Sequence, residues 1–259
     1  MNDSYSNYLR PIFTQNLIQT LQQGHSINLI AQDGQGRRRL VEDIKNSRLK
    51  ETKVILIDMK LYKECYDSFI QVLWQQLEKT GEDPADFGQL IAQLNDKNDE
   101  SITIILHHFD DLLDNLRIDN RFNIAFFDEL NRLGNQPKYS LLCVTSQPHD
   151  QSMVFINKKP YRRSWLELEK KRLPKLTYEE LLFELKFRHF PLTIDDLSQV
   201  AWAVHNHAKP YSLLNYFANK IETQENQSID IQSQLKMWTE QFQKERDSFF
   251  QDGKKSDFF

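Results

Sequence analysis

The sequence predicts an α/β fold in which a parallel sheet flanked by helices is followed by an all-helical region. Between residues 1 and 148, short apolar runs alternate with segments of helical periodicity, which is typical of a parallel sheet covered on both faces. From residue 177 onward, only helical patterns occur. We therefore expect an α/β core over residues 1–150, a basic connecting segment over 151–175, and a helical region with a C-terminal helix over 176–259.

Four continuous apolar runs predict the strands, because a strand that is covered on both faces lacks polar alternation. They are residues 26–31, 53–59, the first part of 101–112, and 139–148. Apolar residues at helical spacing predict the helices that connect them. These helices are expected over residues 12–23, 38–49, 65–81 and 121–134, with a turn and a short helix within 82–100.

Beyond Pro148 the chain becomes basic and loop-like, and we expect one short strand or helix around Trp165–Leu168. Four helices should follow. Two of them begin with a capping-box pattern, Thr177 with Glu180 and Thr193 with Asp196, in which the two side chains bond each other's backbone N–H groups. The predicted helices cover residues 177–190, 193–208, 210–224 and 230–250.

The last of these helices has a continuous apolar face. It places Ile231, Leu235, Trp238 and Phe242 at spacings of four, three and four residues. We expect this face to pack on the other helices, with binding of a partner protein as the alternative.

Composition indicates a folded soluble protein. Of 259 residues, 39% are apolar and 27% are charged, and the formal charge of −4 gives no overall attraction to nucleic acid or to anionic membranes. Two cysteines make no disulfide framework, which favours a reducing cytoplasm. The sequence contains neither a membrane-spanning apolar run nor a signal-peptide pattern, so we expect a cytoplasmic protein without membrane contact.

The segment "NLIAQDGQGRRRL", residues 28–40, resembles a phosphate-binding loop between a strand and a helix. In such a loop, backbone N–H groups and a helix N-terminus bind phosphate, a lysine neutralises its charge, and a hydroxyl group holds Mg²⁺. Here Arg37 replaces the lysine, and Arg38, which can only donate, replaces the hydroxyl residue. The candidate nucleotide-binding residues of this loop are Ala31, Gln32, Asp33, Gly34, Gln35, Gly36, Arg37 and Arg38. For the loop alone, a glycine turn with solvated arginines is an equal alternative.

Two further strand ends carry polar side chains. Asp110 lies where an acid would hold Mg²⁺ through water, and Asp111 lies where a catalytic acid would activate the attacking water. In ATPases with such a loop, the polar residue at the end of a further strand senses the γ-phosphate or the attacking water, and Thr145 or Ser146 resembles it. Because ligands bind at the carboxyl ends of parallel strands, the order of these elements supports a nucleotide site.

Taken together, residues 5 to about 222 resemble P-loop ATPases of the AAA+/STAND group, which includes the archaeal-type and ORC-like ATPases. The resemblance rests on "YLRPIFTQNLIQTLQQG", on the three elements above, on "LEKKRLPKLTYEELLFELK", and on "NHAKPYSLLNYFANKI". It implies a helical lid after the core. It also implies that Pro210 packs against the base of the nucleotide, with His207 nearby.

The altered lysine and missing hydroxyl predict a pseudo-ATPase or very slow ATPase, because phosphoryl transfer depends on charge neutralisation. The resemblance implies binding of ATP or ADP, with Mg²⁺ weakened by the loss of its hydroxyl ligand. We expect a regulatory or assembly subunit in a homo- or hetero-oligomeric complex with other proteins, by analogy a defence or mobile-element system.

Two alternatives stay open. One is an active ATPase that uses Arg37 in an unusual cradle. The other is an adaptor that binds nucleic acid or protein without a nucleotide, through basic residues interleaved with Tyr161 and Trp165. These basic residues are Lys158, Lys159, Arg162, Arg163, Lys170 and Lys171.

The histidines predict no metal site. His107 and His108 are adjacent, so in a strand they would face opposite sides, and His205 and His207 would not share a helix face.

Overall fold

The computed structural model describes residues 7–47, 52–78, 83–95, 101–112, 117–148, 153–156, 159–162, 166–223 and 230–251. The chain forms two compact units. We call them the sheet unit, which comprises Ile12–Gln32 and Val41–Leu173, and the helical unit, which comprises Met1–Pro11, Asp33–Leu40 and Pro174–Phe259. Most of the loop that follows the first strand, from Asp33 onward, therefore belongs to the helical unit, although it lies early in the sequence.

The sheet unit contains a five-stranded parallel sheet in the order β2-β3-β4-β1-β7. Its strands are β1 (Ile27–Ile30), β2 (Thr52–Asp58), β3 (Ser101–His107), β4 (Tyr139–Thr145) and β7 (Glu169–Arg172). Because all pairs are parallel, the carboxyl ends of the strands share one edge of the sheet. The four apolar strands confirm the sequence prediction.

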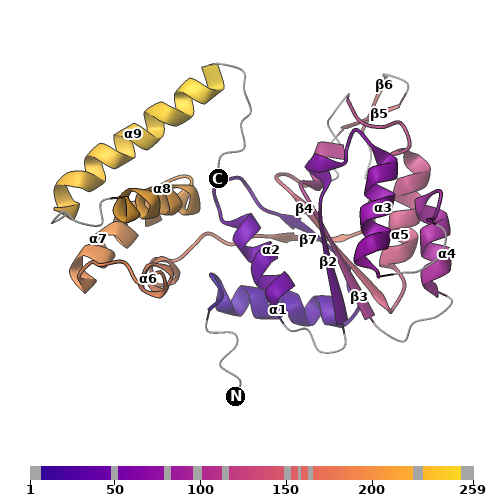
Figure 1. The fold of residues 1–259 in the computed structure, drawn as a ribbon, viewed down its shortest axis with the longest axis horizontal. Coiled ribbons are helices and arrows are strands. Elements are labelled where there is room, and N and C mark those ends of the chain that lie inside the picture. Colours follow the sequence, from indigo (N-terminus) through magenta and orange to yellow (C-terminus); the bar gives the residue numbers. More distant parts are fainter. Residues whose placement is uncertain are drawn as a thin grey trace. The chain divides into compact units, whose positions relative to one another are not determined.

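Helices cover both faces of this sheet (Figure 1). The helices are α1 (Pro11–Gln22), α2 (Arg37–Asn46), α3 (Tyr66–Gln76), α4 (Phe87–Asn95) and α5 (Ile124–Gly134), with 3-10 turns η2 (Met59–Leu61) and η3 (Phe109–Leu112). Figure 1 shows α1 and α2 on the face opposite to α3 and α5. A core of apolar side chains joins α3, α4 and α5 to β2, β3 and β4, with Phe69, Phe126 and Phe127 among its buried rings.

The connecting segment differs from the sequence prediction. A loop was expected, but β5 (Met153–Ile156) and β6 (Lys159–Arg162) form an antiparallel hairpin, described here by its backbone. The expected short element around Trp165–Leu168 instead begins at Glu169, as β7. The position of β7 was wrong because it is an edge strand of sequence EKKR, whose mostly exposed charged side chains show no apolar run.

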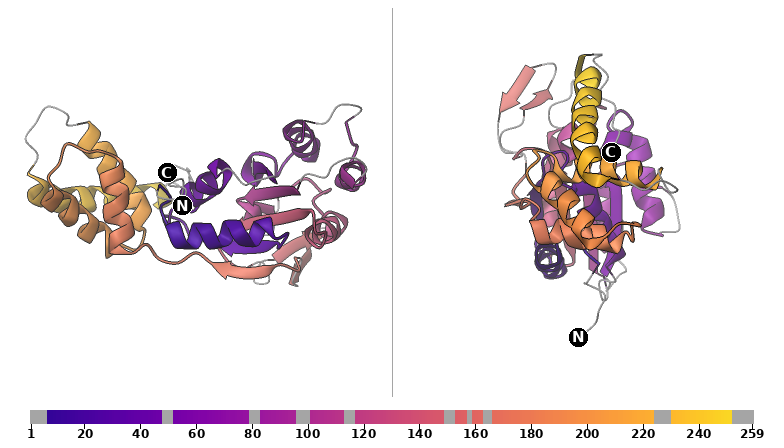
Figure 2. Two further views of the ribbon diagram at one scale, coloured as in Figure 1. Left: turned by 90° about the horizontal axis from the view of Figure 1, so that it is seen from below. Right: turned by 90° about the vertical axis from the view of Figure 1, so that its left-hand side faces the viewer.

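Beyond Pro174, the described residues of the helical unit form four helices that pack around their own core (Figure 2). They are α6 (Tyr178–Phe187), α7 (Ile194–His205), α8 (Pro210–Glu222) and α9 (Ile231–Gln251). Both predicted capping boxes are present, at Thr177 and Thr193. On α9, Ile231, Trp238 and Phe242 are buried and Leu235 is partly buried against the same core, so packing on the other helices is confirmed for this face. Among the described residues, no helix is long and apolar enough to cross a membrane.

Candidate functional site

The loop between β1 and α2 has the backbone of a tight turn that opens a helix. Gly34 and Gly36 have φ values of +79° and +80°, which L-residues with a Cβ atom rarely adopt. α2 begins at Arg37, and its first turn is closed by the Leu40 N–H, which donates to the Gly36 carbonyl at 3.1 Å. The predicted context of the glycine loop, with a strand before it and a helix after it, is therefore confirmed.

The carbonyl groups of this loop are bonded within the helical unit. The Gly34 oxygen accepts from the N–H groups of Tyr211 (2.9 Å) and Ser212 (3.4 Å) at the start of α8. The Gln35 oxygen accepts from Arg10 Nη2 at 2.6 Å. In a planar trans peptide the N–H points opposite to the C=O. The N–H groups of Gln35 and Gly36 consequently point away from α8 and from Arg10.

Side chains of the helical unit leave no room for a Cβ atom at either glycine. A Cβ on Gly34 would lie 2.4 Å from Lys209 Cβ, and one on Gly36 would lie 2.9 Å from Leu9 Cδ2. The Gln35 side chain adds a hydrogen bond to the Ala208 carbonyl at 3.0 Å. The loop is thus held by the segment before α1 and by the start of α8, both far from it in sequence.

The three consecutive arginines have different environments. Arg37 forms an ion pair with Asp33 at 2.8 Å, and Arg38 is exposed. Arg39 donates to Glu184 Oε1 of α6 at 2.8 Å and to the Asn7 carbonyl. Arg37 is the arginine next to the glycine turn, whereas Arg39 joins α2 to α6.

Two cations that were not predicted, Lys209 and Arg246, lie in the same part of the helical unit, where Lys209 is close to both Arg37 and Arg246. Burial lowers the pKa of Lys209, and the charges of Arg246 on α9 and of Arg37 lower it further, against the opposing effect of Asp33. This part of the helical unit therefore brings together more positive than negative charge. Lys209 precedes the predicted Pro210 and could have been suspected for that reason. Arg246 lies 37 residues further along the chain and carried no such signal.

His207 connects the end of α7 to α8. Its Nδ1 accepts from the Lys209 N–H at 3.0 Å, so this nitrogen carries no proton, and its ring lies 5.5 Å from the Phe242 ring. Burial lowers the pKa of His207 below its ordinary value, assisted by the charges of Arg246 and Lys209. Pro210 is buried as the first residue of α8.

The lowered pKa of His207 predicts a loss of stability in acid. Since the unfolded chain binds this proton more readily than the folded one, the contribution of His207 is complete above pH 6.5 and falls as the pH drops below that value. We expect the fall in unfolding free energy between pH 7 and pH 5 to be smaller in His207→Asn than in the wild type. Urea unfolding across this range measures it. An equal fall in unfolding free energy in His207→Asn and in the wild type would contradict the prediction.

At the carboxyl edge of the sheet, the predicted polar residues already have partners. Asp110 Oδ2 accepts from both the N–H and the hydroxyl of Ser146. Asp111 forms an ion pair with Lys63 at 2.9 Å. The structure thus brings Asp110 and Ser146 together, while Asp111 is directed to the segment between η2 and α3.

Thr145 is fully buried at the end of β4. Its hydroxyl accepts from Asn28 Nδ2 at 2.9 Å, and the same Nδ2 donates to the Cys143 carbonyl at 3.1 Å. The Ala31 N–H donates to the Thr145 carbonyl at 2.8 Å. These bonds tie the end of β4 to β1 and to the start of the loop. The sequence did not single out Asn28.

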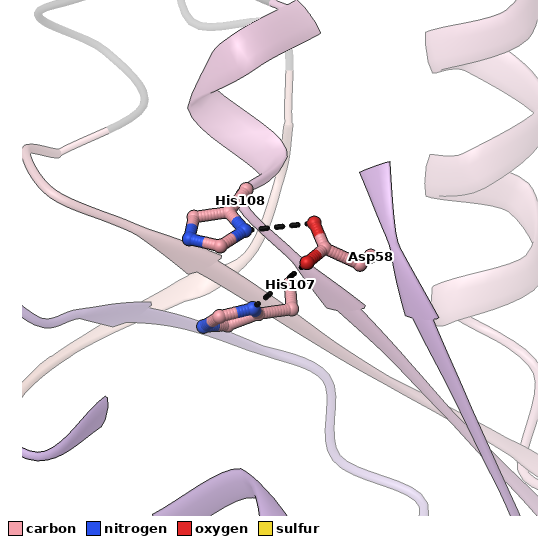
Figure 3. A group of neighbouring side chains, drawn as sticks. All are labelled: Asp58, His107 and His108. Atoms are coloured by element: carbon pink, nitrogen blue, oxygen red, sulfur yellow. Dashed lines mark hydrogen bonds and ion pairs between the residues drawn. The ribbon is translucent and has the colours of Figure 1, made fainter. Parts of the chain in front are cut away.

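The expectation that His107 and His108 face opposite sides is wrong. His107 is the last residue of β3, and His108 follows with a φ of +52°, so strand alternation no longer applies to it. Both rings are directed at Asp58, the last residue of β2 (Figure 3). Burial acts to raise the pKa of Asp58, but the hydrogen bonds and charges of the two histidines outweigh it and hold this pKa far below its ordinary value.

The predicted basic cluster is only partly described. Lys158 and Arg163 lie outside the described residues, as does Trp165, and Lys159, Tyr161 and Arg162 are described by their backbone. Lys170 and Lys171 are neighbours in β7 and therefore point to opposite faces of the sheet. Nucleic-acid binding by these residues remains a prediction.

The chain matches no protein-family model and no curated protein sequence. Its structure is similar to that of the Aeropyrum pernix ORC2 protein in ADPNP-ADP complexes, with a TM-score of 0.59 and 14% identity over 88% of this chain. It is also similar to Cdc6p from Pyrobaculum aerophilum, with a TM-score of 0.56 and 14% identity over 87% of this chain. It spans 66% of the length of each of these two proteins.

Two further structures are similar at lower scores. PCH-2 of C. elegans has a TM-score of 0.51 and 11% identity, covering 93% of this chain and 69% of its own. Drosophila ORC bound to DNA has a TM-score of 0.51 and 12% identity, covering 88% of this chain and 58% of its own. Together with the parallel sheet, these likenesses show that the chain has an α/β P-loop core with a helical region, the fold of the Aeropyrum ORC2 protein and of the Pyrobaculum Cdc6p.

Proposed function

We propose that the chain is a nucleotide-binding subunit that holds ATP or ADP at residues 31–38 and hydrolyses it slowly or not at all. The observation that carries this proposal is the loop of Gly34 and Gly36 at the start of α2, with Arg37 and Lys209 beside it. Backbone N–H groups, a helix N-terminus and two cations are what a phosphate group requires. The ADPNP-ADP complexes of the Aeropyrum protein are consistent with this ligand.

Slow hydrolysis follows from the side chains that a phosphoryl-transfer enzyme would use. Arg38 has no lone pair to offer Mg²⁺, which leaves Asp110, through water, as the proposed metal contact. Asp110 and Ser146 are bonded to each other, and the charge of Asp111 is paired with Lys63. A general base must reach the attacking water, and Asp111 is directed to Lys63, so we expect it to serve poorly in that role. Thr145, Ser146 and Pro210 remain the proposed γ-phosphate and base contacts.

Such a subunit would act through partners, and we propose that it works in a complex with other proteins or further copies of itself. The similar Drosophila ORC structure is a complex bound to DNA, which makes nucleic acid a candidate partner of the assembly. A regulatory or assembly role in a defence or mobile-element system is the most specific form of this proposal and rests on analogy.

Two substitutions test the nucleotide site. In Lys209→Ala and in Arg37→Ala, we expect the affinity for ATP to fall about 10- to 100-fold, because each removes a charged hydrogen-bond donor of about 1.5–3 kcal/mol from the phosphate. Titration of each variant with a fluorescent ATP analogue measures the change.

Lys186→Ala is the matched control, since Lys186 is exposed on α6 of the same unit. Its affinity should equal that of the wild type. Unchanged affinity in both Lys209→Ala and Arg37→Ala would contradict the proposed site, whereas an equal loss in Lys186→Ala would indicate a non-specific effect of net charge.

A further inference from the structure

Asp58, His107 and His108 form a second cluster of side chains at the carboxyl edge of the sheet. None of the three is part of the proposed nucleotide site. β2 and β3 pair in parallel, with Asp58 directly opposite His107 in the register. Both are the last residues of their strands. The sheet therefore fixes a carboxylate and an imidazole side by side at its edge.

The backbone after β3 adds a second imidazole to the same carboxylate. The positive φ of His108 turns its ring back, so that Nδ1 lies 2.7 Å from Asp58 Oδ1. His107 Nδ1 lies 3.9 Å from Asp58 Oδ2. The two ring centroids are 3.8 Å apart, and one donor atom from each of the three residues lies within 4.8 Å of the other two.

The cluster is anchored on one side and accessible on the other. The side chain of His107 is 7% exposed and that of His108 is 18% exposed, while Asp58 is 36% exposed. A small ion could thus reach the three donor atoms from solvent without opening the core.

We propose that Asp58, His107 and His108 bind a divalent transition-metal ion of the Zn²⁺ class. Two imidazoles and one carboxylate are ligands that Zn²⁺ and its neighbours prefer, whereas Mg²⁺ prefers oxygen ligands and water. Bonds of about 2.0–2.2 Å in a tetrahedral arrangement place ligand atoms roughly 3.3 Å apart. The two observed nitrogen–oxygen separations, 2.7 and 3.9 Å, lie on either side of this value, and the three donor atoms all lie within 4.8 Å of one another, so side-chain rotations would bring them to an ion.

Binding of the ion would replace the contacts of the two histidines with Asp58 by bonds from all three side chains to the ion. The two Nδ1 atoms would bind the ion through their lone pairs, with the ring protons on Nε2. Three protein ligands leave a fourth position for water or for another donor. The ion would hold the ends of β2 and β3 together, which the hydrogen-bonded cluster does in its absence.

Titration of the full chain with Zn²⁺ tests this proposal. The protein is first dialysed against a chelator without nucleotide, and binding is measured by calorimetry, with Co²⁺ absorption as a second probe of tetrahedral coordination. We expect the wild type to bind one equivalent of Zn²⁺ and to show a tetrahedral Co²⁺ spectrum. Mg²⁺ in large excess should not compete.

Two variants remove one ligand each. Asp58→Asn keeps the shape of the side chain, and His108→Asn keeps a residue type that tolerates a positive φ. In both we expect at least about a tenfold loss of Zn²⁺ affinity and loss of the tetrahedral spectrum. Circular dichroism establishes that each variant is folded, and a variant that is not folded is left out of the comparison.

His25→Asn removes an exposed histidine and should bind Zn²⁺ as the wild type does. The proposal is overturned if the wild type binds no equivalent of Zn²⁺. It is also overturned if folded Asp58→Asn retains full affinity. Asp110→Asn should leave Zn²⁺ binding unchanged, so this test is independent of the proposed nucleotide site.

Discussion

Replacing Glu184 with alanine is expected to lower the free energy of unfolding by about 3–5 kcal/mol, the largest effect that we predict. Glu184 lies on α6 and is 1% exposed. Its Oε1 accepts from Arg39 Nη1 at 2.8 Å and from Arg188 Nε and Nη2 at 3.0 Å. Without this carboxylate, two arginines that are largely buried would lose their shared counter-charge.

Arg188 also donates to Asn215 Oδ1 of α8 at 2.8 Å, so the loss should loosen α6 from both α2 and α8. Urea unfolding measures the change. Glu179→Ala is the control, because Glu179 is exposed on the same helix, and its cost should stay below about 1 kcal/mol. If the two variants were equally stable, the ion pair would contribute little and Arg39 would be available for another role.

Gly34→Ala is expected to lower the free energy of unfolding by about 2–4 kcal/mol. About half of this comes from a φ of +79° in a residue with a Cβ atom, and the rest from overlap with Lys209. The Cβ atom of Lys209 is fixed by its backbone. That backbone is held close to the loop, because the nearby Tyr211 N–H donates to the Gly34 carbonyl. Chemical denaturation of the variant measures the cost.

Gly88→Ala provides a matched control within α4. Its added Cβ would meet the Asp86 carboxylate at 3.3 Å, and its φ is not positive. Alanine at a helical position should be neutral or stabilising by about 0.5–1 kcal/mol. A stable Gly34→Ala variant would show that the close approach of Lys209 to the loop is not a constraint in the protein.

The fold was largely predictable because its signals are local. Continuous apolar runs marked β1 to β4, and a threonine three residues before an acid marked the starts of α6 and α7. The element expected around Trp165–Leu168 lies further along the chain, as β7, because its charged sequence shows no strand pattern and it forms a strand by pairing with β1. Likewise, α3 was expected to continue to Gly81 but ends at Gln76, and Gly81 lies outside the described residues.

Only the parts of the candidate site that lie in one continuous stretch of sequence could be predicted. The glycine loop could be recognised, but its contacts with Arg10, Lys209 and Tyr211 join segments far apart in the sequence. For the same reason Arg39 was not assigned to Glu184. The histidine cluster depended on one positive φ at His108 and on the register of β2 with β3, neither of which a single sequence displays.

The central claim is that this chain binds ATP or ADP and hydrolyses it slowly or not at all. The most direct measurement is to denature the purified wild-type protein, identify any released nucleotide by chromatography, and measure binding and turnover of added ATP. We predict that ATP or ADP is released or that added ATP binds, with turnover far below the roughly 1 s⁻¹ at the low end of typical enzymes and unaffected by Asp111→Asn. Absence of released nucleotide together with no binding of millimolar ATP would contradict the account, as would rapid turnover that Asp111→Asn abolishes.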